Sequence, residues 1–197
     1  MERSGDRSMK VSHDVITRPF DFVRDRAELL AIISEAKGPM LDLLGAAVSD
    51  GHALILVAEL GGHVVGWTAL RTSYRTDTGW SPDGNTADFV AGDNAYLEYL
   101  EVALLMRGRG VATRLLDATE RGALAAGRNR LWLHTSEANA DAQRLYEREG
   151  WKHVDTIHPT WKDQRATRVY AKDLTPDGPA PRPTSSARGG ERGSPQP

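Results

Sequence analysis

The sequence contains no cysteine and no long apolar run, and both absences exclude classes of function. Without cysteine there is no disulfide framework, no thiolate metal site and no cysteine nucleophile. No apolar segment approaches the length that a membrane-spanning helix needs, so we expect no membrane partner. The first ten residues are charged and lack the apolar core of a signal peptide. We therefore expect a cytoplasmic protein.

The charge balance and the histidines exclude two further classes. The formal net charge is −2, whereas nucleic-acid-binding proteins usually carry an excess of positive charge, so we expect no nucleic-acid partner. The six histidines show no metal-ligand spacing, so we predict no metal cofactor.

The 197 residues suit one domain, which we place at residues 11–174, after a flexible N-terminus at residues 1–10. Residues 175–197 hold six of the ten prolines and almost no large apolar side chain. Such a segment cannot bury enough surface to offset its ordering entropy, so we predict a disordered tail. Its ARGGERG stretch is weakly similar to an RNA-binding RGG segment, but one copy interrupted by Glu is more typical of a solvated tail.

The hydrophobic periodicity predicts a chain that alternates strands and helices. The predicted strands span residues 10–17, 52–60, 63–74, 95–105, 130–135, 151–157 and 166–174, and the predicted helices span residues 21–36, 41–48, 109–126 and 139–149. The central order of strand, helix, strand and helix implies parallel pairing within an α/β sandwich.

A cluster of glycine and arginine lies between a predicted strand and a predicted helix, in the stretch LLMRGRGVATRLL. The first N–H groups of a helix have no backbone partner and form an anion site together with the helix dipole. Glycine lets this backbone approach a phosphate, and Arg107 and Arg109 add charge-assisted donors. The stretch therefore predicts a diphosphate cradle, and the alternative is a glycine turn with two solvated arginines.

Two common phosphate-binding motifs do not fit this cluster. Thr113 stands where a dinucleotide-binding G-x-G-x-x-G motif needs its third glycine, and no acidic residue follows at the ribose position. A P-loop is excluded because the chain has no G-K-[ST].

Two motifs together identify a family resemblance. RGRGVA fits the signature R-x-x-G-x-[GA] through Arg107, Gly110 and Ala112, and NADAQRLYEREGW follows downstream with Asn139 and Tyr146. In this order they resemble the GNAT superfamily of acetyl-CoA-dependent N-acetyltransferases, over roughly the whole predicted domain. The resemblance implies a mixed, mainly antiparallel sheet of six to seven strands, with a splayed parallel central pair and about four flanking helices. The stretch ALLM departs from the family, which often has a proline or polar turn there.

The resemblance also implies how acetyl-CoA, the co-substrate, is held. Backbone N–H groups of the signature loop would bind the pyrophosphate, and these belong to Arg107, Gly108, Arg109, Gly110, Val111, Ala112 and Thr113. The backbone of Leu100 and Val102 would pair with the pantetheine arm. Asn139 would hydrogen-bond the same arm, although Asn is also an ordinary helix N-cap.

The resemblance places Tyr146 beside the thioester sulfur, as the acid that protonates the departing thiolate. A phenol with a pKa of about 10 suits a thiol that titrates at about 8.5. The alternative is an aromatic core residue.

A general base is needed because a free alkylamine, with a pKa of about 10.4, is protonated at neutral pH. Strand alternation predicts that Glu98 shares a face with Leu100 and Val102, while Glu101 shares the other face with Tyr99. Some members of the family use a strand glutamate of the Glu98 parity, so we assign the base to Glu98. A water chain, a buried salt bridge of Glu98 or a β-bulge that upsets the parity are the alternatives.

Acidic and aromatic residues indicate the class of acyl acceptor. Asp77, Trp80 and Asp88 in the turn-rich stretch 75–94, together with Glu101, suit a cationic amine, although a solvated insertion has the same composition. We therefore expect direct acetyl transfer to a small cationic amine, such as an antibiotic or a polyamine. A protein N-terminal or lysine acetyltransferase and a non-catalytic acyl-CoA-binding module are the alternatives. A homodimer is expected only by analogy with relatives.

Overall fold

The computed structural model describes residues 14–33, 37–73, 93–157 and 166–175. The predicted flexible N-terminus and nearly all of the predicted tail lie outside these ranges. So do Asp77, Trp80 and Asp88, which were expected to contact the acceptor.

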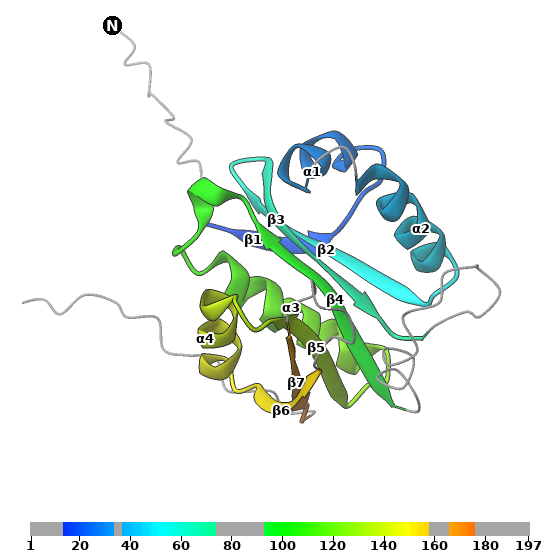
Figure 1. Cartoon of the computed structure of the whole chain (residues 1–197). Coiled ribbons are helices and arrows are strands. Elements are labelled where there is room, and N and C mark those ends of the chain that lie inside the picture. The colour runs from blue at the N-terminus through cyan, green and yellow to red at the C-terminus, as the bar shows by residue number, and fades with distance from the viewer. Residues whose placement is uncertain (1–13, 34–36, 74–92, 158–165, 176–197) are drawn as a thin grey trace, which may run out of the picture.

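Seven strands and four α-helices make up the described part of the chain (Figure 1). The strands are β1 (Ile16–Pro19), β2 (Ala53–Leu60), β3 (His63–Arg71), β4 (Asn94–Val102), β5 (Arg130–Ser136), β6 (Lys152–Ile157) and β7 (Thr167–Asp173). The helices are α1 (Arg26–Ile33), α2 (Gly38–Ser49), α3 (Val111–Ala125) and α4 (Ala140–Arg148), with a 3₁₀ turn, η3, at Leu104–Met106.

The strands form one sheet in the order β1-β2-β3-β4-β5-β7-β6. Only the central pair, β4 and β5, is parallel, and every other neighbouring pair is antiparallel. A parallel pair needs a crossover connection, which α3 supplies. The predicted fold class, a mixed and mainly antiparallel sheet with a parallel central pair, is therefore confirmed.

The central pair separates soon after it begins. Strand β4 pairs with β5 only from Asn94 opposite Arg130 to Tyr96 opposite Trp132. Beyond Tyr96, β4 continues to pair with β3 as far as Val102. The edge of residues 97–102 that faces β5 is therefore not paired to a strand in the described chain. We call the opening between the separated parts of β4 and β5 the wedge.

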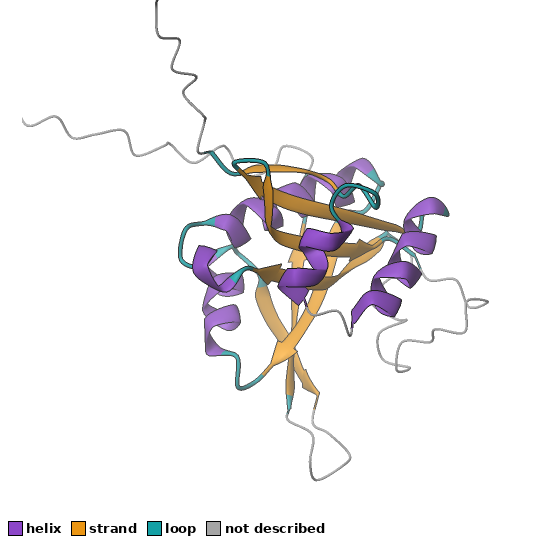
Figure 2. Ribbon diagram, turned by 90° about the horizontal axis from the view of Figure 1, so that it is seen from above, coloured by secondary structure: helices purple, strands orange, loops and turns teal. Residues whose placement is uncertain are grey.

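Helices cover both faces of the sheet (Figure 2), and each face has its own apolar core. On one face α1 and α2 pack against β2 and β3 around Trp67, which is fully buried. On the other face α3 and α4 pack against β4, β5 and β7 around Leu116, Leu133 and Tyr170. Figure 1 shows β4 between the half of the molecule that carries α1 and α2 and the half that carries α4. The wedge therefore opens at the centre of the molecule.

Several predicted elements have other ends in the structure: the first strand extends to Pro19 and not to residue 17, and the second helix begins at Gly38 and not at residue 41. Two further differences have a clear local cause. The first helix begins at Arg26 and not at residue 21, because the carboxylate of Asp21 accepts N–H bonds from Val23 and Arg24 and forms a separate turn. The central strand ends at Val102 and not at residue 105. The apolar residues after it belong to η3, where Leu105 is 86% exposed, so their composition suggested a strand that the chain does not form.

The described residues contain neither a membrane-spanning helix nor a cluster of metal ligands. No helix among them is long and apolar enough to cross a bilayer. No group of three or more His, Asp or Glu side chains among them could hold a metal ion.

We predict that Leu116→Ala lowers the free energy of unfolding by about 2–5 kcal/mol, since it leaves a cavity between α3 and the sheet. Leu116 is 1% exposed within the core of α3, α4 and the sheet. Leu105→Ala, the matched control at an exposed position, should change it by less than about 0.5 kcal/mol. Urea denaturation measures both. Equal losses in the two variants would contradict the assignment of this core.

Candidate active site

A glycine turn connects the end of β4 to the start of α3. Gly108 and Gly110 have φ angles of 73° and 77°, in the left-handed region that favours glycine. Gly110 is the N-cap of α3, and no side chain caps this helix. The first N–H groups of a 15-residue helix thus remain for an anion, in the field of the positive end of the helix dipole.

Both arginines of the turn are exposed. The Nε of Arg107 donates to the carbonyl oxygen of Val102 at 3.3 Å and ties the turn back to the end of β4. Arg109 lies between the two glycines. Two guanidinium groups beside an uncapped helix start make this turn the strongest anion-binding candidate among the predicted site residues.

Leu100 and Val102 lie on the part of β4 that borders the wedge. The backbone of each is opposite β3, where Leu100 faces Thr68 and Val102 faces Gly66. Their side chains pack against the core beneath α3, beside Val111. This arrangement leaves the second backbone edge of β4 toward the wedge, where an extended ligand can pair with it.

Thr113 is joined to α4. Its hydroxyl donates to Oε1 of Glu149 at 3.0 Å, so only the backbone N–H of Thr113 fits the predicted phosphate contact. The side chain of Glu149 is 4% exposed and also accepts from Arg148 at 3.3 Å. The bond connects the start of α3 with the end of α4.

Helix α4 presents the two residues of the second motif. The side chain of Asn139 accepts the N–H of Ala142 at 3.2 Å, so its expected N-cap role is confirmed. Tyr146 is 7% exposed, with its ring 5.8 Å from that of Tyr170 and 6.0 Å from that of Trp151. Burial, with a smaller effect of Tyr170, raises the pKa of Tyr146 to about 12. The phenol therefore stays protonated throughout the neutral range, and it is a weaker acid than an unperturbed tyrosine.

The predicted parity of Glu98 is wrong, because a β-bulge interrupts β4. The register against β3 passes from Leu97 directly to Tyr99 and skips Glu98. As a result Leu97 and Leu100 both pack on the α3 side. Alternation counted from Leu100 therefore assigns the side chain of Glu98 to the wrong face of the sheet.

Glu98 instead forms a buried ion pair. Its carboxylate accepts from the Nε of Arg71 at 2.7 Å, and the two side chains are 7% and 9% exposed. Arg71 alternates on β3 with Leu70, which packs on the α3 side, so the pair lies on the opposite, α1–α2 face. Burial raises the pKa of the Glu98 carboxyl, and the Arg71 guanidinium opposes that rise.

Glu101 and Tyr99 lie together, as alternation predicted. The carboxylate of Glu101 accepts from Lys37 at 2.6 Å, at the start of α2. The ring of Tyr99 stacks on that of Trp67 at 5.2 Å, and the Lys37 ammonium lies 6.0 Å from the centre of the Tyr99 ring. This part of the α1–α2 face is aromatic and polar.

Sequence reasoning missed a second polar pair beside the wedge. The hydroxyl of Tyr96 on β4 is hydrogen-bonded to Nδ1 of His134 on β5, and the two rings stack at 5.6 Å. The pair joins strands that are far apart in the sequence. No local pattern signals it, because it depends on the register between β4 and β5.

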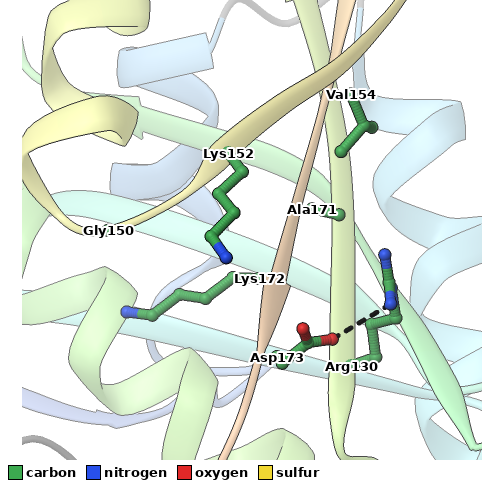
Figure 3. A pocket seen from close by; sticks show the side chains of 7 residues that line it. All are labelled: Arg130, Gly150, Lys152, Val154, Ala171, Lys172 and Asp173. Carbon is green, nitrogen blue, oxygen red and sulfur yellow. Dashed lines mark ion pairs between the residues drawn. The ribbon is translucent and has the colours of Figure 1, made fainter.

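The pocket in Figure 3 is lined by other residues. It has a volume of about 150 Å³ and lies against β5, β6 and β7, where Arg130 and Asp173 form an ion pair at 3.1 Å (Figure 3). Lys152 and Lys172 also line it. None of the predicted site residues does.

Comparison with known proteins agrees with this geometry. A model of the acetyltransferase (GNAT) family matches residues 20–151. An N-acetyltransferase from Staphylococcus aureus Mu50 superposes with a TM-score of 0.62 at 20% identity, over 82% of this chain and 99% of that one. A GNAT family acetyltransferase from Elizabethkingia anophelis with acetyl-CoA bound has a TM-score of 0.56 at 14% identity, over 81% and 98%. Nourseothricin acetyltransferase has a TM-score of 0.51 at 21% identity, over 64% and 68%.

The structural matches show a shared fold, and the family model covers more than half of the chain. With the uncapped glycine turn, the wedge and the buried tyrosine, they lead to one conclusion: the chain belongs to the acetyltransferase (GNAT) family and is an acyltransferase.

Proposed function

We propose that this protein transfers an acetyl group from acetyl-CoA directly to the primary amine of a small cationic molecule, such as an antibiotic or a polyamine. The observation that supports this most is the wedge between β4 and β5. It has an uncapped helix start at one end, and Tyr146 belongs to the core of the adjoining α3–α4 face.

Acetyl-CoA fits the residues at both of these places. The pyrophosphate would be bound by the backbone N–H groups of residues 107–113, with Arg107 and Arg109 supplying charge. The pantetheine arm would pair with the open backbone edge of β4 at Leu100 and Val102, as an added strand does at a sheet edge.

The transfer needs three proton movements around one nucleophilic attack. An ammonium acceptor first loses a proton to the carboxylate of Glu98, whose raised pKa makes it a stronger base than an ordinary glutamate. The neutral amine then attacks the thioester carbonyl, so that a C–N bond forms and the C–S bond breaks. A backbone N–H near Val102 would stabilise the oxyanion. The departing thiolate takes a proton from Tyr146. The nitrogen loses its second proton as the amide forms, and this proton returns to the phenolate, so that Tyr146 is neutral again.

Side chains on the α1–α2 face of β4 support the proposed class of acceptor. Glu98 and Glu101 put two carboxylates there, beside the stacked rings of Tyr99 and Trp67. Carboxylates next to aromatic rings suit an ammonium group. Such a group would compete with Lys37 for Glu101. One protein of this fold is named for acetylating nourseothricin.

The first experiment measures release of free CoA from acetyl-CoA with aminoglycosides, polyamines, amino acids and peptides with a free N-terminus or lysine. Turnover with one cationic small molecule supports the proposal. Turnover with peptides alone would replace it by protein acetylation. Tight CoA binding without turnover would leave a non-catalytic acyl-CoA-binding module.

We predict that Gly110→Ala weakens CoA binding by about tenfold. A Cβ at φ 77° costs about 1–2 kcal/mol of backbone strain and projects at the helix start where the pyrophosphate would bind. Isothermal titration calorimetry measures the dissociation constant. Gly127→Ala introduces the same strain at φ 72°, just past the far end of α3, and should leave it unchanged. The cradle assignment fails if both variants bind CoA equally well.

We predict that Tyr146→Phe lowers kcat about tenfold or more, the scale of a lost acid, with little change in the KM for acetyl-CoA. Steady-state kinetics measure both constants. The control is Tyr170→Phe, which removes a neighbouring phenol that donates to Glu147 at 3.2 Å. An unchanged kcat in Tyr146→Phe would leave Tyr146 as a core residue only.

We predict that Glu98→Gln lowers kcat about tenfold or more and removes a limb of the pH profile. Because burial raises the pKa of Glu98, the wild-type kcat should fall with decreasing pH at a higher pH than an ordinary glutamate would produce. Glu59→Gln, which removes a carboxylate paired with Arg18, is the matched control. A uniform loss with an unaltered pH profile would mean that Glu98 is only the partner of Arg71.

A further inference from the structure

The proton taken by Glu98 has to leave a buried position. The Glu98 side chain is 7% exposed and lies against Arg71, so bulk water has little access to its carboxylate. An enzyme that turns over repeatedly must return this group to its ionised form. The neighbouring polar groups on the same face are therefore the candidates for a route to solvent.

Tyr96 begins such a route on the side of β5. It stands directly opposite Arg71 in the register of β3 and β4, and Arg71 in turn donates to Glu98. Opposite residues in an antiparallel pair have neighbouring side chains on one face. Tyr96 is also the last residue of β4 that pairs with β5, so its hydroxyl lies where the wedge begins.

His134 ends the route at the surface. Its Nδ1 is hydrogen-bonded to the Tyr96 hydroxyl, and the residue is exposed. It comes two residues after Trp132, the last residue of β5 that pairs with β4. Histidine is the side chain that exchanges protons most readily near neutral pH.

We propose that Tyr96 and His134 carry the proton of the amine from Glu98 to solvent, an inference that rests on the proposed function. A water between the two side chains would carry the proton from the Glu98 carboxyl to the Tyr96 oxygen, as the tyrosine's own proton passes to Nδ1 of His134. The resulting imidazolium releases the Nε2 proton to water, and exchange of the ring protons with water then restores the tautomer with a free Nδ1. Glu98 returns to the carboxylate, Tyr96 stays neutral, and only protons move.

Other charged groups on this face also lie around Tyr96 and His134. Charged side chains of the described chain on the neighbouring strands include Arg71, opposite Tyr96, its partner Glu98, and Arg130, which lies over the ring of Trp132. The residue opposite His134 on β7 is Val169. Tyr96 and His134 act through Glu98, so they are positioning and relay residues in this scheme.

The kinetic test compares Tyr96→Phe, His134→Gln and His134→Ala with wild type, using the amine of highest turnover in the panel. We expect kcat to fall at least about tenfold in all three, with an unchanged KM for acetyl-CoA and a shifted pH profile. Added imidazole should restore activity to His134→Ala. His153→Gln, an exposed histidine on the opposite face of the sheet, should match wild type. A kcat within about twofold of wild type, or a loss that imidazole does not restore with an unmoved pH profile, overturns the relay.

A second measurement does not depend on turnover. NMR titration of the His134 ring in wild type, Tyr96→Phe and Glu98→Gln should show that both substitutions move its midpoint, because the relay couples the three groups. A midpoint that neither substitution moves overturns the relay even if acetyl transfer is observed. If no amine supports turnover, the proposed function fails and the titration alone decides whether the three groups are coupled.

Discussion

The rest of the structure depends on one constraint, which is that β4 has backbone partners on both sides for only part of its length. Buried N–H and C=O groups need hydrogen-bond partners. Where a strand separates from its neighbour inside a domain, a ligand can supply the partners that the neighbour no longer provides. Here β4 leaves β5 after Tyr96 and remains paired with β3 to Val102. The glycine turn and α3 begin directly beyond that point, which gives one continuous line from strand edge to helix start.

A buried polar network keeps the elements around this line in place. Lys172 on β7 donates to Glu120 on α3 at 2.5 Å and to the backbone oxygen of Glu149 at 2.9 Å. Glu149 in turn accepts the hydroxyl of Thr113 in the first turn of α3. Burial raises the pKa of Glu120, and Lys172 opposes the rise. Because a buried charge without its partner costs several kcal/mol, this network fixes α3 relative to α4 and β7.

The sequence predicts the motifs well and the cross-strand contacts poorly. The turn, the N-cap at Asn139 and the parallel pair follow from local signals, namely glycine spacing, a capping residue and alternating elements. Glu98 shows the limit of such signals: one extra residue in β4 turned its side chain away from the face that alternation assigned. The ion pair with Arg71 and the contact of Tyr96 with His134 depend on register between distant segments. No periodicity within one segment contains that information.

The bulge at Glu98 also separates two kinds of chemistry along one strand. Leu97, Leu100 and the core under α3 face the side that would bind the acyl donor, whereas Tyr99 and the Arg71–Glu98 pair face the side proposed for the acceptor. Under the proposed function, substitutions on the acceptor side would therefore alter what is acetylated and leave the packing under α3 intact. New acceptors would then arise from changes on one face of one strand, while the proposed donor site stays the same.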